Sequence, residues 1–318
     1  MPAKSLKAAD KQTILKKLVT EMKKRYGGSI PKQNRSVFET LLFAACLEDV
    51  GYEQAEAAYT RLLDGFFDLN EIRVSSVNEI EQALGEIEYS DWKAMRIREA
   101  LQFVFEKHYS FDLEQLKRKT QEQAQKELVQ IPHQTAFIRA YGIQHSLAAH
   151  LIPVDTRIHQ LLVWLGLAEE GSDAEAVGDD LKSGVKKTDA PLLCYLLKCT
   201  STDPELKGHF SDGPVPGETD PFTAAQRLVD LFKNPKKKRK PAKPVPVKAS
   251  EKHTEKGAGK VAEKATEKPV PAGKAVSRKK PEKKVTANRA VASKTAPASS
   301  RKVTKKVPPK KVNRSGKK

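Results

Sequence analysis

The chain has 318 residues and a net charge of +18, and this charge is unevenly distributed. Residues 233–318 carry 30 of the 58 Lys and Arg but only 5 of the 40 Asp and Glu, and they contain no Leu, Ile, Met, Cys, Phe, Tyr or Trp. Such a segment cannot bury enough apolar surface to offset its chain entropy, so we expect it to be disordered. Residues 1–232 carry a net charge of −7 and are long enough to form a sizeable hydrophobic core.

The composition also excludes several classes of protein. Three cysteines, Cys46, Cys194 and Cys199, are too few for a disulfide framework. The N-terminal residues lack an apolar signal-like core, and the longest apolar run, residues 161–168, is far shorter than a bilayer crossing requires. We therefore expect an intracellular protein that does not enter a membrane. We also expect the protein to be a monomer.

Apolar residues recur at helical spacing through most of residues 1–232, and no alternating strand pattern appears. The first apolar stripe runs from Ile14 to Met22 and stops at Gly27. Residues 36–47 are apolar nearly all round, which predicts a central buried helix. Further helices are expected over residues 52–63, 76–84, 90–104, 113–129, 189–199 and 223–232, and another begins near Arg157.

Two of these helices have recognisable starts. Ser76 and Glu79 form a capping box, in which each residue bonds to the other's backbone. Ser90 is expected to cap the following helix, with Trp92 and Met95 on its inner side.

One carboxylate stands at the start of an apolar helix in the stretch "HLIPVDTRIHQLLVWLG". Asp155 follows the apolar residues 151–154 and precedes the helical pattern 158–165. Asp155 or Thr156 can act as a helix cap, because short polar side chains accept hydrogen bonds from the first free backbone N–H groups. A fixed carboxylate at such a place can also serve catalysis, and the two roles are compatible.

The order of these segments resembles the helix-hairpin-helix DNA glycosylases of the endonuclease III type, over roughly residues 10–200. The family's "LLSAQ" glutamine corresponds to Cys46, and the following Asp to Asp49. Its "Y-x-x-K-A" start corresponds to residues 89–94, and its "V-D-T-H" to residues 154–157. The resemblance rests on these pieces occurring together in this order.

The resemblance implies an all-α fold of two helical subdomains, with a cleft that receives a flipped base from double-stranded DNA. Asp155 would face this cleft and either stabilise the developing oxocarbenium charge or activate a water. Cys46 and Phe137 would be candidates for the base pocket. The hairpin that grips the DNA backbone would consist of Ile131, Pro132, His133, Gln134 and Thr135.

The first departure from the family concerns its Schiff-base lysine. An ungapped alignment from Asp155 places Phe137 there, and a gapped one places Gln134. There is no lysine at all between Lys126 and Lys182, and neither Phe nor Gln can replace an amine nucleophile. We therefore expect no abasic-site lyase activity, and at most a monofunctional glycosylase.

Two further departures concern the hairpin and the iron–sulfur loop. The family's "LPGVG" is replaced by "IPHQT", so His133 and Thr135 put side chains where glycines let backbone N–H groups approach a phosphate. Cys194 and Cys199 alone cannot hold a four-cysteine cluster. A metal site that combines them with nearby histidines is conceivable, but no pair has strong zinc-ligand spacing. No cofactor and no metal are expected.

Two charged segments complete the sequence. Residues 168–180 hold six acids, which predicts a solvated acidic loop; contact with the basic segment 233–318 is the alternative. The basic segment resembles linker-histone-like tails and offers phosphate neutralisation without base readout. It opens with Lys236, Lys237, Lys238, Arg239 and Lys240, which we expect to bind DNA and which are of a nuclear-import type.

Two functions from different classes remain open. One is a monofunctional DNA glycosylase that uses Asp155. The other is a glycosylase-fold protein without chemistry, which binds nucleoid or chromatin DNA through its basic segment. The absent hairpin glycines favour the second function, and the presence of Asp155 favours the first.

Overall fold

The structure is a computed structural model that describes residues 6–32, 34–211 and 219–235. All of these residues belong to the first of the two units into which the chain divides, Met1–Pro246. Every regular element within them is helical, so the expectation of an all-α fold is confirmed there. Across the same ranges, no helix has the length and apolar content needed to cross a bilayer. The expected DNA-binding residues Lys236–Lys240 lie outside the described part of the chain.

The helices follow one another with short connections. Their bounds are α1 (Ala8–Tyr26), α2 (Val37–Leu47), α3 (Tyr52–Asp64), α4 (Leu69–Val74), α5 (Val77–Leu84), α6 (Ser90–His108), η1 (Glu114–Arg118), α7 (Gln121–Leu128), α8 (Ala136–Leu147), α9 (Thr156–Leu165), α10 (Ala174–Lys182), α11 (Ala190–Thr202), α12 (Lys207–Ser211), η2 (Pro221–Thr223) and α13 (Ala224–Lys233).

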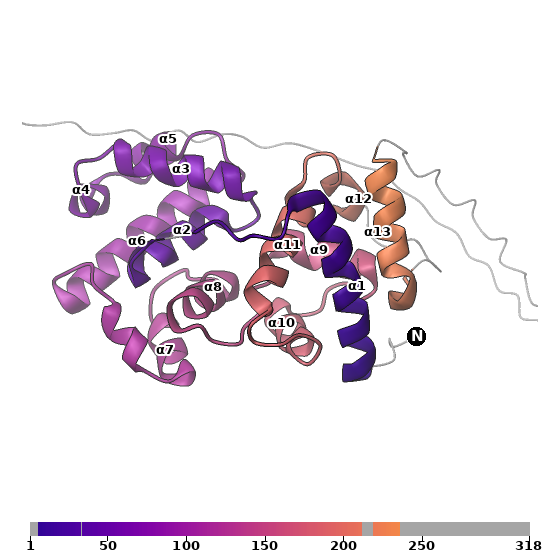
Figure 1. The fold of residues 1–318 in the computed structure, drawn as a ribbon. Helices are drawn as coiled ribbons and strands as arrows, with labels where there is room; N and C mark the ends of the chain where they lie inside the picture. The colour runs from indigo at the N-terminus through magenta and orange to yellow at the C-terminus, as the bar shows by residue number, and fades with distance from the viewer. Residues whose placement is uncertain (1–5, 33, 212–218, 236–318) are drawn as a thin grey trace, which may run out of the picture. The chain divides into compact units, whose positions relative to one another are not determined.

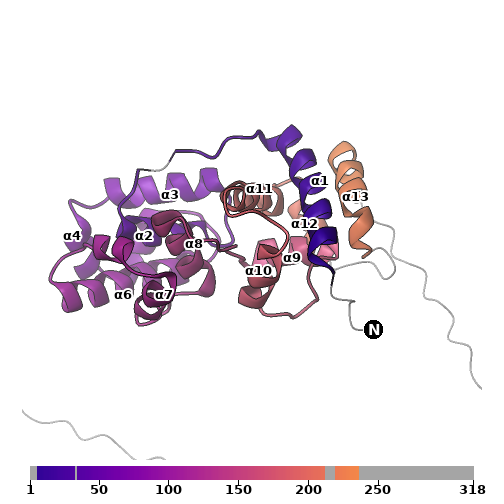
Figure 2. The same ribbon diagram turned by 60° about the horizontal axis from the view of Figure 1, so that its bottom comes forward.

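The helices form two groups (Figure 1). Helices α2 to α8 pack on one another and form the first group. In the second group, α1 packs against α13 and α11, and α9 packs against α11 and α12. Both views place α1 beside α13, so the start of the described chain lies next to its end (Figures 1 and 2). The segment between α8 and α9 passes from the first group to the second, and it carries Asp155.

Helix α2 is the centre of the first group. All but one of its residues are buried, and it packs against α3, α6 and α8. Ser36 and Glu39 form a capping box at its start. At its other end, the buried Lys93 Nζ donates to the carbonyl oxygens of Ala45 (3.1 Å) and Glu48 (2.5 Å), which the helix itself leaves unpaired. The prediction of a central buried helix over residues 36–47 is confirmed.

The predicted start of α6 is wrong in two respects. Ser90 begins the helix but does not cap it, since its hydroxyl donates to Glu81 on α5. Trp92, expected on the inner side, is 53 % exposed, and the buried position belongs to its neighbour Lys93. The aliphatic part of a lysine can replace an apolar side chain in the core when its ammonium finds carbonyl oxygens, so hydrophobicity alone misassigned this face.

Two charged segments also differ from expectation. The helix predicted over residues 113–129 is split into η1 and α7, because Thr120 starts a new capping box with Gln123. The acidic segment 168–180 is not simply a loop, since Asp173 caps α10, which begins at Ala174. An acidic side chain in the first turn suits the positive end of a helix.

Candidate functional site

Asp155 is the N-cap of α9. Its backbone is extended (φ −105°, ψ −177°), and its Oδ1 accepts a hydrogen bond of 2.9 Å from the backbone N–H of Ile158. The residue is 4 % exposed. The capping role expected from the sequence is therefore confirmed, and it places a carboxylate at the positive end of a ten-residue helix.

The other oxygen of Asp155 is engaged as well. Its Oδ2 accepts a hydrogen bond of 2.9 Å from the backbone N–H of Asp49 and another from the ammonium of Lys198 on α11. The ammonium of Lys198 lies 5.2 Å from the ring centre of Phe137. The side chains of Asp155 and Lys198 are 0 % and 2 % exposed, so this is a buried ion pair that joins α9 and α11.

Asp49 brings a second carboxylate to the same helix end. Its Oδ1 accepts a hydrogen bond of 3.2 Å from the backbone N–H of Arg157. Across the junction between the two helix groups, Asp155 thus accepts from the backbone of Asp49, and Asp49 accepts from the backbone of Arg157, two residues after Asp155. The pKa of Asp49 is raised, because the group is half-buried and because the charge of Asp155 lies nearby. Its φ of 58° is left-handed, a region that Asp tolerates better than most residues.

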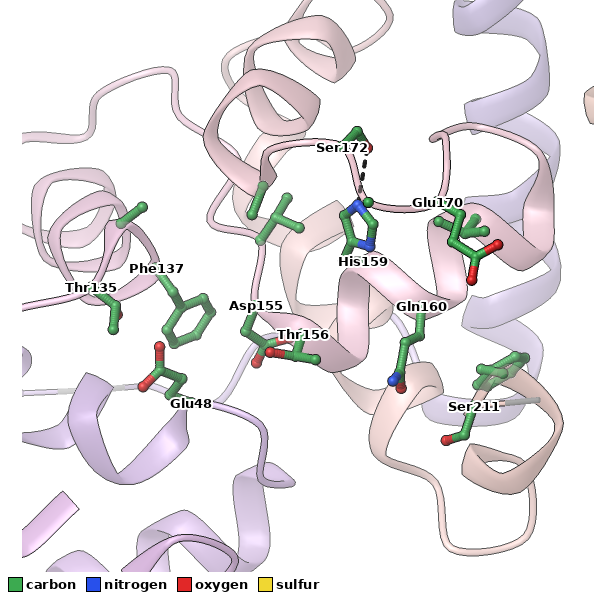
Figure 3. A pocket seen from close by; sticks show the side chains of 16 residues that line it. Glu48, Thr135, Phe137, Asp155, Thr156, His159, Gln160, Glu170, Ser172 and Ser211 are labelled. Carbon is green, nitrogen blue, oxygen red and sulfur yellow. Dashed lines mark hydrogen bonds between the residues drawn. The ribbon is translucent and has the colours of Figure 1, made fainter. Parts of the chain in front are cut away.

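A cavity of about 500 Å³ opens beside Asp155. Figure 3 shows Glu48 and Phe137 on one side of Asp155, and His159 and Gln160 further along α9 on the other. Phe137, Val154 and Val163 give the cavity apolar surface, whereas its polar groups include Gln160 and the His159 ring, whose Nε2 lies 3.0 Å from Ser172 Oγ. A cavity of this size, lined by both apolar and polar side chains, suits a small ligand.

A second hollow of about 470 Å³ adjoins the first, since Glu48, Thr135 and Thr156 line both. Asp49 lines this second hollow, which we call the rim hollow. Its remaining lining residues are Tyr89, Trp92, Lys93 and Arg96.

Two of the residues that line the rim hollow are aromatic side chains exposed to solvent. Tyr89 is 60 % exposed and Trp92 is 53 % exposed. Tyr89 also has a left-handed backbone (φ 59°), which is costly for a bulky residue. Such strain is a common property of functional sites. The acid on this wall, Glu48, is paired with the guanidinium of Arg96.

The residues predicted for the base pocket are only partly brought together. Phe137 lines the Asp155 cavity. Cys46 is 0 % exposed and lines neither hollow, and burial raises the pKa of its thiol to about 12. A deeply buried neutral thiol cannot contact a ligand, because the core of α2 encloses it. The structure therefore contradicts Cys46 as a pocket residue.

The predicted hairpin segment lies next to the same cavity. Thr135 caps α8, accepting from the backbone N–H of Ile138 (3.2 Å), and it lines both hollows. His133 is exposed and has a φ of 58°, so it occupies a left-handed turn position where a glycine would be unstrained. Ile131 is buried, and Pro132 and Gln134 are half-buried.

Sequence reasoning missed Lys198 and the role of Asp49. Lys198 is the only charged residue within the apolar run 190–199, and it sits at helical spacing from the buried Cys194. That pattern signals a buried lysine, but no pattern within one helix can name its partner. In the described ranges, no three His, Cys, Asp or Glu side chains are grouped to hold a metal ion.

Comparisons with known proteins give structural likeness only. No family model matches the chain, and no curated protein matches it. An endonuclease III trapped as a covalent intermediate with DNA is 17 % identical, with a TM-score of 0.47, over 59 % of this chain and 84 % of that one. A 3-methyladenine DNA glycosylase of H. pylori, bound to 1,N6-ethenoadenine, is 16 % identical with a TM-score of 0.47, over 62 % of this chain and 100 % of its own. A thermostable thymine-DNA glycosylase is 14 % identical with a TM-score of 0.46, over 61 % and 87 %.

Proposed function

We propose that this protein binds DNA and cleaves the N-glycosidic bond of a base that leaves the helix and enters the Asp155 cavity. The observation that carries the proposal is the cavity of about 500 Å³, with the aromatic wall of Phe137 and the buried carboxylate of Asp155 at one place. Enzymes that act on a base in DNA need such a pocket, because the reacting atoms are otherwise inside the base stack.

The charges of the site fit a reaction that develops positive charge. Glycosidic bonds break through oxocarbenium-like states, in which the sugar becomes cationic. Asp155 and Asp49 supply two carboxylates, and Lys198 supplies one ammonium. When both carboxylates are ionised, these three groups carry one net negative charge, and the Lys93 ammonium on the rim hollow also interacts with the charge of Asp49. A carboxylate held in place by fixed hydrogen-bond donors can stabilise a developing cation without having to reorganise.

The aromatic rim suits a distorted DNA duplex. Exposed rings such as Tyr89 and Trp92 can stack on bases or fill the space that an extruded nucleotide leaves. Their place on the rim hollow, next to the Asp155 cavity, would put them beside the extruded nucleotide.

We assign most of the DNA affinity to residues 233–318, including Lys236–Lys240. With a net charge of +25, this segment can neutralise many phosphates without reading sequence. The segment 131–135, with Thr135 at the junction of the hollows, would then make the local contacts at the site. The partner we propose is double-stranded DNA, bound by one copy of the chain.

We expect no Schiff-base chemistry from this site. Lys198 lies beside Phe137, but its ammonium is bound to Asp155 and closed off from the cavity, so it is not a free amine. The mechanism proposed is therefore hydrolysis, with water as the nucleophile.

One observation favours the second candidate, a DNA-binding module without chemistry. Both oxygens of Asp155 already hold hydrogen bonds, and its side chain is 0 % exposed. A carboxylate so enclosed can act through its charge, but it cannot take a proton from a bound water without giving up a partner.

The test is an assay on duplexes that each carry one altered base. The panel contains uracil, thymine glycol, 8-oxoguanine, 1,N6-ethenoadenine and 3-methyladenine, and strand breaks are read after alkali. We expect alkali-dependent breaks in at least one duplex with the full-length protein. These should fall at least about 100-fold in the Asp155→Asn variant, because a carboxylate charge near the reacting sugar is lost. Tight binding without breaks in any duplex would support the binding module.

A control addresses the folding of that variant. Asp155→Asn leaves the buried Lys198 without a counter-charge, so the double variant with Lys198→Met is tested beside it. An inactive but normally folded double variant would separate lost chemistry from lost structure.

A further inference from the structure

Asp49, unlike Asp155, has a carboxylate oxygen that can accept a hydrogen bond from a bound molecule. For Oδ2 of Asp49, the described residues supply no hydrogen-bond donor, whereas both oxygens of Asp155 are occupied. Asp49 is also half-buried and lines the rim hollow, while the side chain of Asp155 is fully enclosed. Of the two carboxylates at the start of α9, only Asp49 offers an oxygen to a molecule in the hollow.

The positions of the two hollows suggest how a bound nucleotide would lie. Thr135, Thr156 and Glu48 line both hollows and therefore mark their junction. A base in the Asp155 cavity, stacked toward Phe137, would leave its sugar near this junction. In that arrangement the rim hollow, which Asp49 lines, would adjoin the sugar at this junction.

We propose that Asp49 is the catalytic base of this site and that it takes a proton from the attacking water, while Asp155 acts only through its charge. This inference rests on the proposed glycosidic hydrolysis. The water oxygen bonds to C1′ as the C1′–N bond breaks, and one water proton passes to Oδ2 of Asp49. The departing base takes up one proton from solvent, and Asp49 later returns its own proton to solvent, so atoms and charges balance.

The surroundings of Asp49 suit this task. Burial and the neighbouring charges of Asp155 and Glu48 raise the pKa of Asp49, while Lys198 and the backbone N–H of Arg157 act in the opposite direction. The ammonium of Lys93 on α6 and the guanidinium of Arg157 on α9 also interact with the Asp49 charge. A base whose pKa lies closer to neutrality transfers protons more effectively than an ordinary Asp. The backbone of Asp49 is left-handed, and its Oδ1 accepts from the backbone N–H of Arg157 in the first turn of α9.

The experiment uses the full-length protein and the five duplexes named above, under single-turnover conditions between pH 5 and 9. Asp49→Asn keeps an oxygen that can accept from Arg157 but cannot take a proton. Asp49→Gly fits the left-handed backbone without strain and leaves space for a small carboxylate. Glu86→Gln, an exposed site with no described partner, controls for the loss of one negative charge.

We expect Asp49→Asn and Asp49→Gly to lower the rate of base release by about 100-fold or more, as removal of a general base does. Binding to a duplex with a tetrahydrofuran abasic analogue should change less than about threefold, and Glu86→Gln should match the wild type. Added formate should raise the rate of Asp49→Gly but not that of the wild type. The wild-type rate should rise with pH through the pKa of Asp49, and this limb should vanish in Asp49→Asn.

Two different results would overturn the inference. If the wild type releases a base and both Asp49 variants do so within about threefold of its rate, Asp49 is not the base and the proposed function stands. If the wild type releases no base from any of the five duplexes, the proposed function fails and the role of Asp49 fails with it.

Discussion

Asp155 holds three separate segments together with one carboxylate. It caps α9, accepts from the loop that follows α2 through Asp49, and neutralises the buried Lys198. Asp155 is therefore a helix cap in the structure, and we propose that the charge of the same carboxylate also acts in catalysis.

The first prediction concerns the cation in this cluster. Lys198→Met should lower the free energy of unfolding by about 3–5 kcal/mol, because it leaves Asp155 buried without its counter-charge. The double variant with Asp155→Asn should recover part of this loss, since an amide needs no cation and can still accept from Ile158. Urea denaturation of the wild type, the Lys198→Met and Asp155→Asn variants and the double variant at pH 7 gives the coupling free energy between the two side chains. Two single variants that each cost less than about 1 kcal/mol would show that the pair is unimportant for stability.

The second prediction concerns acid stability. His145 stacks on Tyr141 (ring centres 4.1 Å apart), and burial, with the charge of Arg35 nearby, lowers the pKa of His145 to about 4. Between about pH 4 and its ordinary pKa of 6.5, the unfolded chain binds a proton that the folded chain does not. The free energy of unfolding should therefore fall as the pH drops through this window, by at most about 3 kcal/mol from this group.

His145→Phe keeps an aromatic ring on Tyr141 and removes the titrating group. Its free energy of unfolding should depend less on pH between 4 and 6.5 than that of the wild type, as urea denaturation at several pH values would show. His133→Asn, at an exposed position, is the control. An unchanged pH dependence in His145→Phe would assign the acid sensitivity to other groups.

Among the helices, α10 packs against the segment that leads to Asp155. Gly178 lies in α10 against the backbone of this segment, and a Cβ added there would meet the carbonyl oxygen of Ile152 at 2.4 Å. A backbone atom cannot rotate away as a side chain can. The close packing of α10 against this segment therefore requires a glycine at position 178. This packing helps to position the segment that leads to Asp155.

The third prediction follows from this contact. Gly178→Ala should destabilise the protein by about 1–3 kcal/mol, because overpacking forces the backbone apart. Gly208→Ala, in α12, meets nothing within 4 Å and should be neutral or slightly stabilising, since Ala favours helices. Thermal unfolding compares the two variants. Equal melting temperatures would mean that α10 moves freely against the Asp155 segment.

The sequence could predict elements whose signals are local. The burial of α2 followed from its apolar composition, and the start of α5 from the Ser76–Glu79 box, which the structure contains. The start of α6 could not be predicted, because Lys93 is buried by carbonyl oxygens of α2 that lie far from it in sequence. The Asp155 cap could be predicted because its signal is local in the sequence. Its partner Lys198 could not, because the pair depends on the packing of α9 against α11.

At the scale of the whole molecule, charge is divided between two parts of the chain. Residues 1–232 carry a net charge of −7, and most of the cations near the site are paired, such as Arg96 with Glu48 and Arg157 with Glu88. Residues 233–318 carry +25. We infer that the site and the bulk of the DNA affinity reside in different parts of the molecule.

The fourth prediction is a salt dependence. The affinity of the full-length protein for an undamaged duplex should fall steeply between 50 and 200 mM salt (on the order of 10³-fold or more for many phosphate contacts). A chain that ends after residue 235, and so retains α13, should lose most of this affinity. Fluorescence anisotropy with a labelled duplex measures both. Equal affinity with and without the segment would place the DNA-binding surface in the helical part.

The activity we propose for this protein is release of a base from DNA in the Asp155 cavity. The most direct measurement is mass spectrometry of free bases released from genomic DNA that has been methylated, oxidised or deaminated, since it does not require the substrate to be guessed. We expect the wild-type protein to release at least one altered base in amounts that rise with time, and the Asp155→Asn/Lys198→Met variant, folded as judged by circular dichroism, to release none. Release of no base by the wild-type protein, or equal release by the variant, would contradict it.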